Sequence, residues 1–145
     1  MGIRILRCNT CGNIIAFHED SGATPQCCGH QMEELKFNEV DASLEKHLPF
    51  VRTEHVSKPD HCNGTKFTHR DDCNTFVTVK VGETPHPMTD DHYIEWICLE
   101  TNCGTHTRYF DPGDEAENTF CLCRCEKPEA VYAYCNLHGL WRTLV

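Results

Sequence analysis

The sequence lacks the features that mark a membrane protein, a secreted protein or a nucleic-acid-binding protein. No segment approaches the roughly 18 consecutive apolar residues of a membrane helix, and residues 1–10 lack the apolar run of a signal peptide. The chain has 13 Lys and Arg against 22 Asp and Glu, a formal net charge of −9, and its basic residues do not cluster. We therefore expect a cytoplasmic protein whose partners include neither a membrane nor a nucleic acid.

Long helical periodicity and internal repeats are also absent, so the fold class must come from shorter patterns. The 145 residues, 39% of them hydrophobic, suffice for one or two small domains with a modest core. Apolar and polar residues alternate over five short segments, as they do in strands. These segments are 76–81, 93–99, 105–110, 118–122 and 130–134. Turn-forming residues separate them, which predicts an antiparallel β-sandwich or barrel.

Cysteine and histidine, in contrast, are abundant, with 12 Cys and 10 His. Such a density is typical either of a disulfide-linked secreted scaffold or of metal ligation in a reducing compartment. The missing signal peptide favours metal, and so does the clustering of these residues at spacings that metals use.

The first cluster lies near the N-terminus and contains Cys8, Cys11, Cys27 and Cys28. Four thiolates from two tight turns make a tetrahedral site for iron or zinc. About 35 residues cannot fold by apolar burial alone, so we expect the ion to be structural whatever else it does. Two disulfides are the alternative. Adjacent ligands cannot both lie in a relaxed turn, which predicts a distorted tetrahedron.

The second set of candidate ligands is dispersed over the rest of the chain. It comprises His47 after Glu45 and Lys46, the loop residues His86 and His92, and the pair Cys135 and His138. A lone histidine is more often a surface or core residue than a ligand. The Cys-x-x-His spacing of the last pair is stronger, because it lets both side chains reach one ion.

Taken together and in this order, the motifs resemble desulfoferrodoxin, the two-iron class of superoxide reductase, over nearly the whole chain. The stretches that carry the resemblance are the four-cysteine pattern, 40–47, 81–88, 92–97 and 135–141. The resemblance implies a mainly β protein with two domains. Residues 1–36 would form a small rubredoxin- or desulforedoxin-like metal domain, and residues 37–145 a neelaredoxin-like, immunoglobulin-like antiparallel β-sandwich.

The resemblance also implies a catalytic iron held by four histidines in a plane and one axial thiolate. Carried over by motif, the ligands are His47, His86, His92, His138 and Cys135, and a second iron, or zinc, occupies the four-cysteine site.

The implied reaction is the one-electron reduction of superoxide to hydrogen peroxide. The electron comes from an external donor such as rubredoxin, and a homodimer is the implied assembly. Glu45 would occupy the sixth position of the oxidised iron, while Lys46 would attract the anion and orient a proton-donating water. Without the surrounding motif, these two residues would be interpreted as a solvated loop pair.

Two other function classes remain as hypotheses. One is an electron-transfer or peroxide-response protein whose second iron does not turn over. The other is an interaction module that uses both ligand sets for structural zinc. A closed structural zinc site needs four ligands rather than five, which favours the reductase.

The chain departs from the family pattern in an inserted stretch around residues 51–75. We expect this stretch near the active-site side, because it follows His47 directly. Its thiols and imidazoles allow a plain hairpin, a Cys62–Cys73 disulfide or a further metal site; they are His55, His61, Cys62, His69 and Cys73.

Seven cysteines exceed the needs of the two metal sites: 62, 73, 98, 103, 121, 123 and 125. The alternation of Cys121, Cys123 and Cys125 predicts that all three share one face of a strand. They could be small buried or reduced residues, or could form disulfides, for instance with Cys98 or Cys103. In a reducing compartment we expect reduced thiols, although peroxide would put exposed ones at risk.

Overall fold

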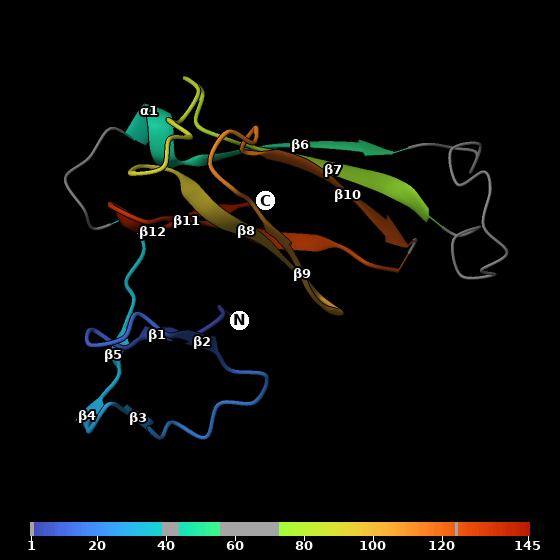
Figure 1. Cartoon of the computed structure of the whole chain (residues 1–145). Coiled ribbons are helices and arrows are strands. Elements are labelled where there is room, and N and C mark those ends of the chain that lie inside the picture. The colour runs from blue at the N-terminus through green and yellow to red at the C-terminus, as the bar shows by residue number, and fades with distance from the viewer. Residues whose placement is uncertain (1, 39–43, 56–72, 124) are drawn as a thin grey trace, which may run out of the picture.

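The computed structural model describes residues 2–38, 44–55, 73–123 and 125–145, and β-strands make up most of its regular structure (Figure 1). Seven of these strands form a sandwich of two antiparallel sheets, which confirms the predicted fold class. The first sheet has the order β10–β7–β6 and the second the order β12–β11–β8–β9. Their bounds are β6 (Pro49–His55), β7 (Cys73–Val81), β8 (Ile94–Thr101), β9 (Gly104–Tyr109), β10 (Glu117–Cys123), β11 (Pro128–Cys135) and β12 (Gly139–Leu144).

The sandwich core forms where alternate residues of the two sheets face each other. Val77 and Val79 of β7 pack in one buried cluster with Leu99 of β8 and Val131 of β11. Strand β11 is buried from Ala130 to Cys135 without alternation. The reason is that both faces of its sheet are covered, as is usual for a central strand of a protein layer.

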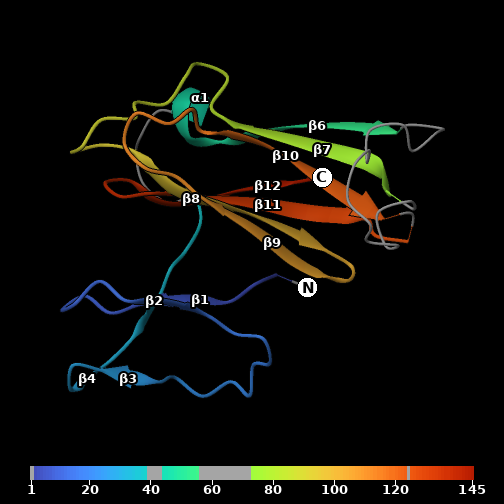
Figure 2. The same cartoon turned by 45° about the vertical axis from the view of Figure 1, so that its right-hand side comes forward.

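The N-terminal segment covers the outer face of the second sheet (Figures 1 and 2). It contains β1 (Ile5–Arg7), β2 (Ile14–Ala16), β3 (Gln26–Cys27), β4 (His30–Gln31) and β5 (Glu33–Glu34). Ile5 packs in one buried cluster with Tyr132 and Leu140 of the sandwich. The connecting segment continues this contact. Phe37 forms a backbone β-bridge to Leu140, and the guanidinium carbon of Arg142 lies over the Phe37 ring, 3.7 Å from the ring centroid.

The five strands predicted from alternation are present as β7 to β11. The alternation does not predict strands β6 and β12. Each of them directly follows or overlaps a metal-binding motif, which hides the strand pattern. Among the described residues, α1 (Leu44–His47) has four residues, and no helix there is long and apolar enough to cross a membrane.

The described residues of the inserted stretch, 51–55 and 73–75, belong to strands β6 and β7. In the β6–β7 pair, Pro49 lies opposite Val81, and His55 lies opposite Thr75. Pro49 and Val81 adjoin α1, so His55 and Thr75 are at the far end from it (Figure 1). The described residues at its two ends therefore lead away from α1, and the expectation that the stretch adjoins the active site stays a prediction, because residues 56–72 lie outside the described residues. His61, Cys62, His69 and the side chain of Cys73 lie outside the described residues, as does the Cys62–Cys73 alternative.

Candidate metal centres

Five predicted ligands from three separate parts of the chain converge at one end of the sandwich. One ligand atom from each of them lies within 4.8 Å of all the others; they are His47, His86, His92, Cys135 and His138. His47 ends α1, His86 and His92 lie in the loop between β7 and β8, and Cys135 and His138 enclose the turn between β11 and β12.

The four imidazoles form a closed ring of perpendicular neighbours. The ring centroids of His47 and His86 are 4.7 Å apart, those of His86 and His92 4.6 Å, those of His92 and His138 4.9 Å, and those of His138 and His47 4.7 Å. Neighbouring ring planes meet at 78° to 89°. His47 and His92, which face each other across the ring, are 6.1 Å apart. This is the arrangement of four corners around a central point.

The nitrogens at the centre of this ring have the character of ligand atoms. His86 donates its Nδ1 hydrogen to the carbonyl oxygen of Pro87 at 2.6 Å, which directs its Nε2 inward. The Nε2 atoms of His86 and His92 are buried and have no hydrogen-bond partner among the described residues. A buried polar atom without a partner is costly. A divalent ion at the centre of the ring would give both Nε2 atoms a partner.

The electrostatics of the histidine ring favour neutral imidazoles. Burial lowers the pKa of His86 to about 4, and repulsion from His47, His92 and His138 adds to this effect while the Pro87 carbonyl opposes it. Burial also lowers the pKa of His92, with further contributions from His138 and Lys46. Neutral imidazole is the form that binds metals.

Cys135 supplies the fifth donor from the buried side. Its side chain is fully buried, and the backbone N–H of His138 donates to its sulfur at 3.4 Å. Burial raises the pKa of the thiol, while the backbone N–H groups of His138 and Leu137 oppose this shift. A bound cation would stabilise the thiolate. Four neutral nitrogens and one thiolate suit iron, as the sequence predicts, and leave a sixth position.

Gly82 holds α1, and with it His47, against the loop that carries His86. The Gly82 N–H donates to the carbonyl of Leu48 at 2.9 Å, and the Thr84 N–H donates to that of Glu45 at 3.2 Å. Gly82 has a φ of 82°. A Cβ atom there would lie 2.4 Å from the Thr84 carbonyl oxygen and 2.6 Å from that of Lys46. Only glycine permits this approach.

Asn136 fixes the other half of the ligand ring. Its Oδ1 accepts from the Tyr93 N–H at 3.0 Å, and its Nδ2 donates to the Asp91 carbonyl at 3.0 Å. Asn136, which follows Cys135, is thereby hydrogen-bonded to Asp91 and Tyr93, the residues on either side of His92.

Trp141 supports the ring from within the core. Its fully buried ring stacks on His47 with centroids 4.8 Å apart and an interplanar angle of 24°. Sequence reasoning placed neither Asn136 nor Trp141 in the site. Both lie within the 135–141 motif, and that position was the available signal.

Glu45 and Lys46 lie on α1 immediately before His47, and both are exposed. Lys46 is near enough to His92 to lower the pKa of that imidazole. Glu45 does not belong to the group of five converging donors.

The second predicted metal centre is also assembled. One sulfur from each of Cys8, Cys11, Cys27 and Cys28 lies within 4.8 Å of the others. The sulfurs of Cys11 and Cys27 are 3.5 Å apart, and those of Cys27 and Cys28 are 4.0 Å apart. These separations bracket the value of about 3.8 Å expected for a tetrahedron with metal–sulfur bonds near 2.3 Å.

The adjacent ligands are accommodated by an unusual backbone. Cys28 has a φ of 51°, in the left-handed region that a non-glycine residue seldom adopts. The thiols also repel one another as anions. Hydrogen bonds with Cys11 and Cys27 raise the pKa of Cys28 to about 12, whereas backbone N–H groups of Cys11 and Thr10 lower that of Cys8 to about 6. A cation relieves such repulsion, which accounts for four thiols at one point.

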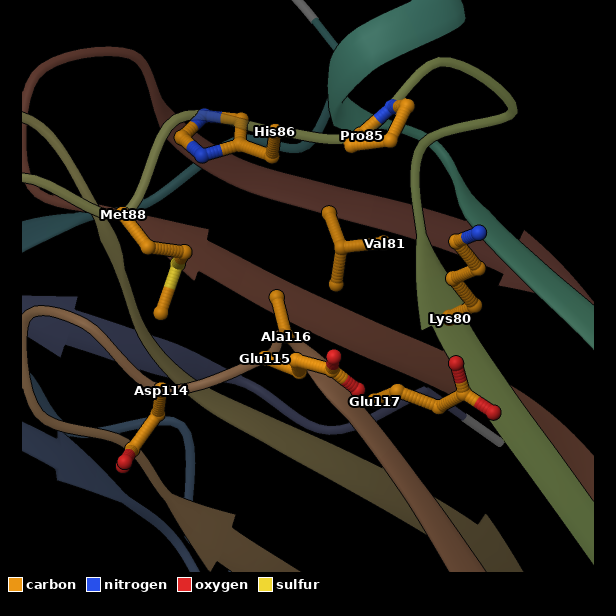
Figure 3. A pocket seen from close by; sticks show the side chains of 9 residues that line it. All are labelled: Lys80, Val81, Pro85, His86, Met88, Asp114, Glu115, Ala116 and Glu117. Atoms are coloured by element: carbon orange, nitrogen blue, oxygen red, sulfur yellow. The ribbon is translucent and has the colours of Figure 1, made fainter.

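A pocket of about 250 Å³ is lined in part by His86 (Figure 3). Val81, Met88 and Ala116 provide its apolar floor, and the Ile94 N–H donates to the Met88 sulfur at 3.4 Å. Its rim is charged, with Lys80 against Asp114, Glu115 and Glu117. The negative rim adjoins one edge of the metal centre.

The surplus cysteines do not form disulfides among the described residues. Cys121 and Cys123 share the outward face of β10, but the strand ends at Cys123, so Cys125 lies in the following turn. The prediction of three thiols on one strand face is therefore correct only for the first two. Cys98 is buried in the cluster beneath the N-terminal segment.

The fold and the two ligand sets define a mainly β metalloprotein with a four-histidine, one-cysteine centre and a four-cysteine centre. The sequence model of the family described as "Desulfoferrodoxin" matches residues 39–144. The chain belongs to the desulfoferrodoxin family.

Relatives and solved structures agree with this assignment. Desulfoferrodoxin from Syntrophotalea carbinolica is 34% identical over 139 residues, which cover 96% of this chain and 94% of the relative. Desulfoferrodoxin from Nitratidesulfovibrio vulgaris is 34% identical over 140 residues, covering 95% and 93%. The crystal structure of the superoxide reductase from Treponema pallidum covers 99% of each chain at 27% identity, with a TM-score of 0.70.

Proposed function

We propose that the protein is a superoxide reductase that turns superoxide into hydrogen peroxide at its four-histidine, one-cysteine centre. The observation that carries this proposal is the convergence of five donors, two of which are buried Nε2 atoms without a partner, beside the exposed pair Glu45 and Lys46. The reaction consumes one electron and two protons for each superoxide and releases no dioxygen. When bound, ferrous iron supplies that electron and an open coordination position.

The burial of the ligands indicates the side from which superoxide arrives. Cys135 is fully buried, whereas His92 and His138 are partly exposed. Solvent therefore reaches the ring from the side away from the sulfur. Leu137, which precedes His138 in the sequence, is 59% exposed, in keeping with access from this side.

Lys46 has two tasks in this proposal. The chain as a whole carries a charge of −9 and repels an anion, so attraction must be local. The Lys46 ammonium, adjacent to His47 and close to His92, provides it. The same group orients a water molecule that donates a proton to the departing peroxide. Glu45, on the preceding position of α1, would be the carboxylate available to bind the oxidised iron.

The four-cysteine centre is proposed as a second one-electron site if it holds iron and as a purely structural site if it holds zinc; either ion also holds residues 1–36 together as a domain. Residues 37–145 form the reductase domain. An external donor of the rubredoxin type supplies the electrons, the assembly is a homodimer, and the compartment is the cytoplasm.

Metal content and the visible spectrum test the assignment of both centres. Protein made in iron-replete medium should contain iron at both ligand sets, with two chromophores that ascorbate reduces separately. One iron and one zinc would preserve the reductase and remove the four-cysteine centre from electron transfer. Zinc alone, with no iron chromophore after anaerobic reconstitution, would overturn the proposal. His86→Ala should lose one chromophore, and Cys121→Ser, which alters a thiol outside both centres, should keep both.

A further inference from the structure

Two cysteines that the proposed reaction does not use lie on neighbouring connections at the end of the sandwich remote from the histidine centre. Cys103 lies in the turn between β8 and β9, and Cys125 lies in the connection between β10 and β11; both are exposed. Strand β11 begins at Pro128, opposite Thr101, and ends at Cys135 in the metal centre. Seven residue steps of about 3.3 Å separate the two ends by roughly 23 Å.

A network of hydrogen bonds from Asn102 holds these two segments in register. The Asn102 side chain donates to the Cys125 carbonyl at 3.1 Å and accepts from the Lys127 N–H at 2.7 Å. Its backbone N–H donates to the Lys127 carbonyl at 3.1 Å. Because Asn102 immediately precedes Cys103, these bonds fix the position of one cysteine relative to the other.

A second set of contacts involves Glu126, the residue after Cys125. Its Oε1 accepts a hydrogen bond from the Thr101 hydroxyl at 2.8 Å and lies 2.6 Å from the His106 Nε2. Asn102, next to Cys103, and Glu126, next to Cys125, are therefore both anchored across the gap. These contacts hold the β8–β9 turn against the β10–β11 connection.

The Cys125 side chain is close enough to Cys103 to influence the pKa of its thiol. Burial raises the pKa of Cys103, and Cys125 adds to this shift through charge repulsion and a hydrogen bond between the two side chains. Glu126 and Cys123 add further negative charge. Among the described residues, the groups whose donor atoms converge tightly enough for a metal are the two centres already described. Cys103 and Cys125 therefore belong to neither metal centre, and the reaction open to two neighbouring thiols is the formation of a disulfide bond.

We propose that Cys103 and Cys125 form a dithiol site that hydrogen peroxide oxidises to a disulfide. The Cys125 thiolate attacks peroxide, breaking the O–O bond and giving a sulfenic acid and hydroxide. The Cys103 thiol then attacks the Cys125 sulfur and expels water. Two thiols lose two electrons and two protons in total, and one peroxide becomes two water molecules.

This inference rests on the proposed function only for the source of the peroxide. A protein that releases peroxide at one end would then carry, at its other end, a two-electron sink that consumes it. The disulfide would join the β8–β9 turn to the β10–β11 connection without disturbing the histidine centre. Cys98 cannot take part from its place beneath the N-terminal segment, where it is buried with Tyr132.

The test uses the reduced, iron-loaded full chain and added hydrogen peroxide, followed by N-ethylmaleimide to block unreacted thiols. Combined cleavage after Lys or Arg and after Glu isolates Cys103 in fragment 101–108 and Cys125 in fragment 125–126. The expected product is the two fragments joined, lighter than their sum by two hydrogen atoms. Cys103→Ser and Cys125→Ser should each abolish it, and the control Cys121→Ser should retain it.

Alkylation of both cysteines after peroxide treatment would overturn the inference, as would linkage of either one to Cys62, Cys73 or another cysteine. Added peroxide makes this result independent of the reductase activity. In a second arm, superoxide replaces peroxide, and catalase is included or omitted. Linkage with added peroxide but none with superoxide would refute the peroxide source, and thus the proposed function, while the dithiol chemistry stands.

Discussion

Gly82→Ala tests the claim that a close backbone approach positions His47 in the ligand ring. The new Cβ would meet two backbone carbonyl oxygens, of Thr84 at 2.4 Å and of Lys46 at 2.6 Å, neither of which can rotate away. A left-handed φ of 82° costs an alanine about 1–2 kcal/mol. Displacing α1 to relieve the clash adds about 1–3 kcal/mol. We expect a total loss of about 2–5 kcal/mol, a large share of the ~5–15 kcal/mol that stabilises a typical domain.

The assay is urea unfolding of the iron-loaded protein, together with the spectrum and iron content of the histidine centre. Gly113→Ala is the matched control, because Gly113 has a φ of 92° and nothing within 4 Å of the added Cβ. The control should lose only the conformational part, about 1–2 kcal/mol, and keep its spectrum. Equal losses in the two variants, with both spectra unchanged, would refute the positioning role of Gly82.

Three further predictions concern single side chains. Lys46→Ala should slow the second-order reaction with superoxide and flatten its dependence on salt, measured by stopped-flow mixing; an unchanged rate would remove Lys46 from the mechanism. Trp141→Ala should cost about 3–5 kcal/mol and lower iron occupancy, because the His47 ring loses its stacking partner, whereas Trp141→Phe should retain the iron. Cys11→Ser should remove the metal of the four-cysteine centre and leave the histidine chromophore intact, and loss of both would show that the centres are coupled.

The strands of the sandwich were predictable where one face of a strand is buried and the other is not. The alternation in β7 and β10 is of this kind, since Val77, Val79, Phe120 and Leu122 point inward. Strands β6 and β12 were missed for a different reason. Each follows a metal-binding motif directly, and the residues of β12 from Gly139 to Trp141 belong to the motif itself.

The candidate site was predictable only in part from local chemistry. The four-cysteine centre follows from spacing, because its ligands lie in two short turns. The five donors of the histidine centre span His47 to His138, and no local spacing links them, so their grouping came from the family resemblance. What neither source provided is the support: Gly82, Asn136 and Trp141 act through backbone approach, cross-loop hydrogen bonds and stacking, which exist only once the sheets have paired.

The yield of hydrogen peroxide per superoxide consumed tests the central claim most directly. The fully reduced, iron-loaded protein is mixed anaerobically with limiting superoxide, and peroxide and dioxygen are both measured. Reduction predicts one peroxide for each superoxide, no dioxygen, and oxidation of one ferrous centre per event. One peroxide for every two superoxides, with dioxygen released, would mean dismutation, and superoxide that decays no faster than in buffer would mean no reaction; either result would contradict a reductase.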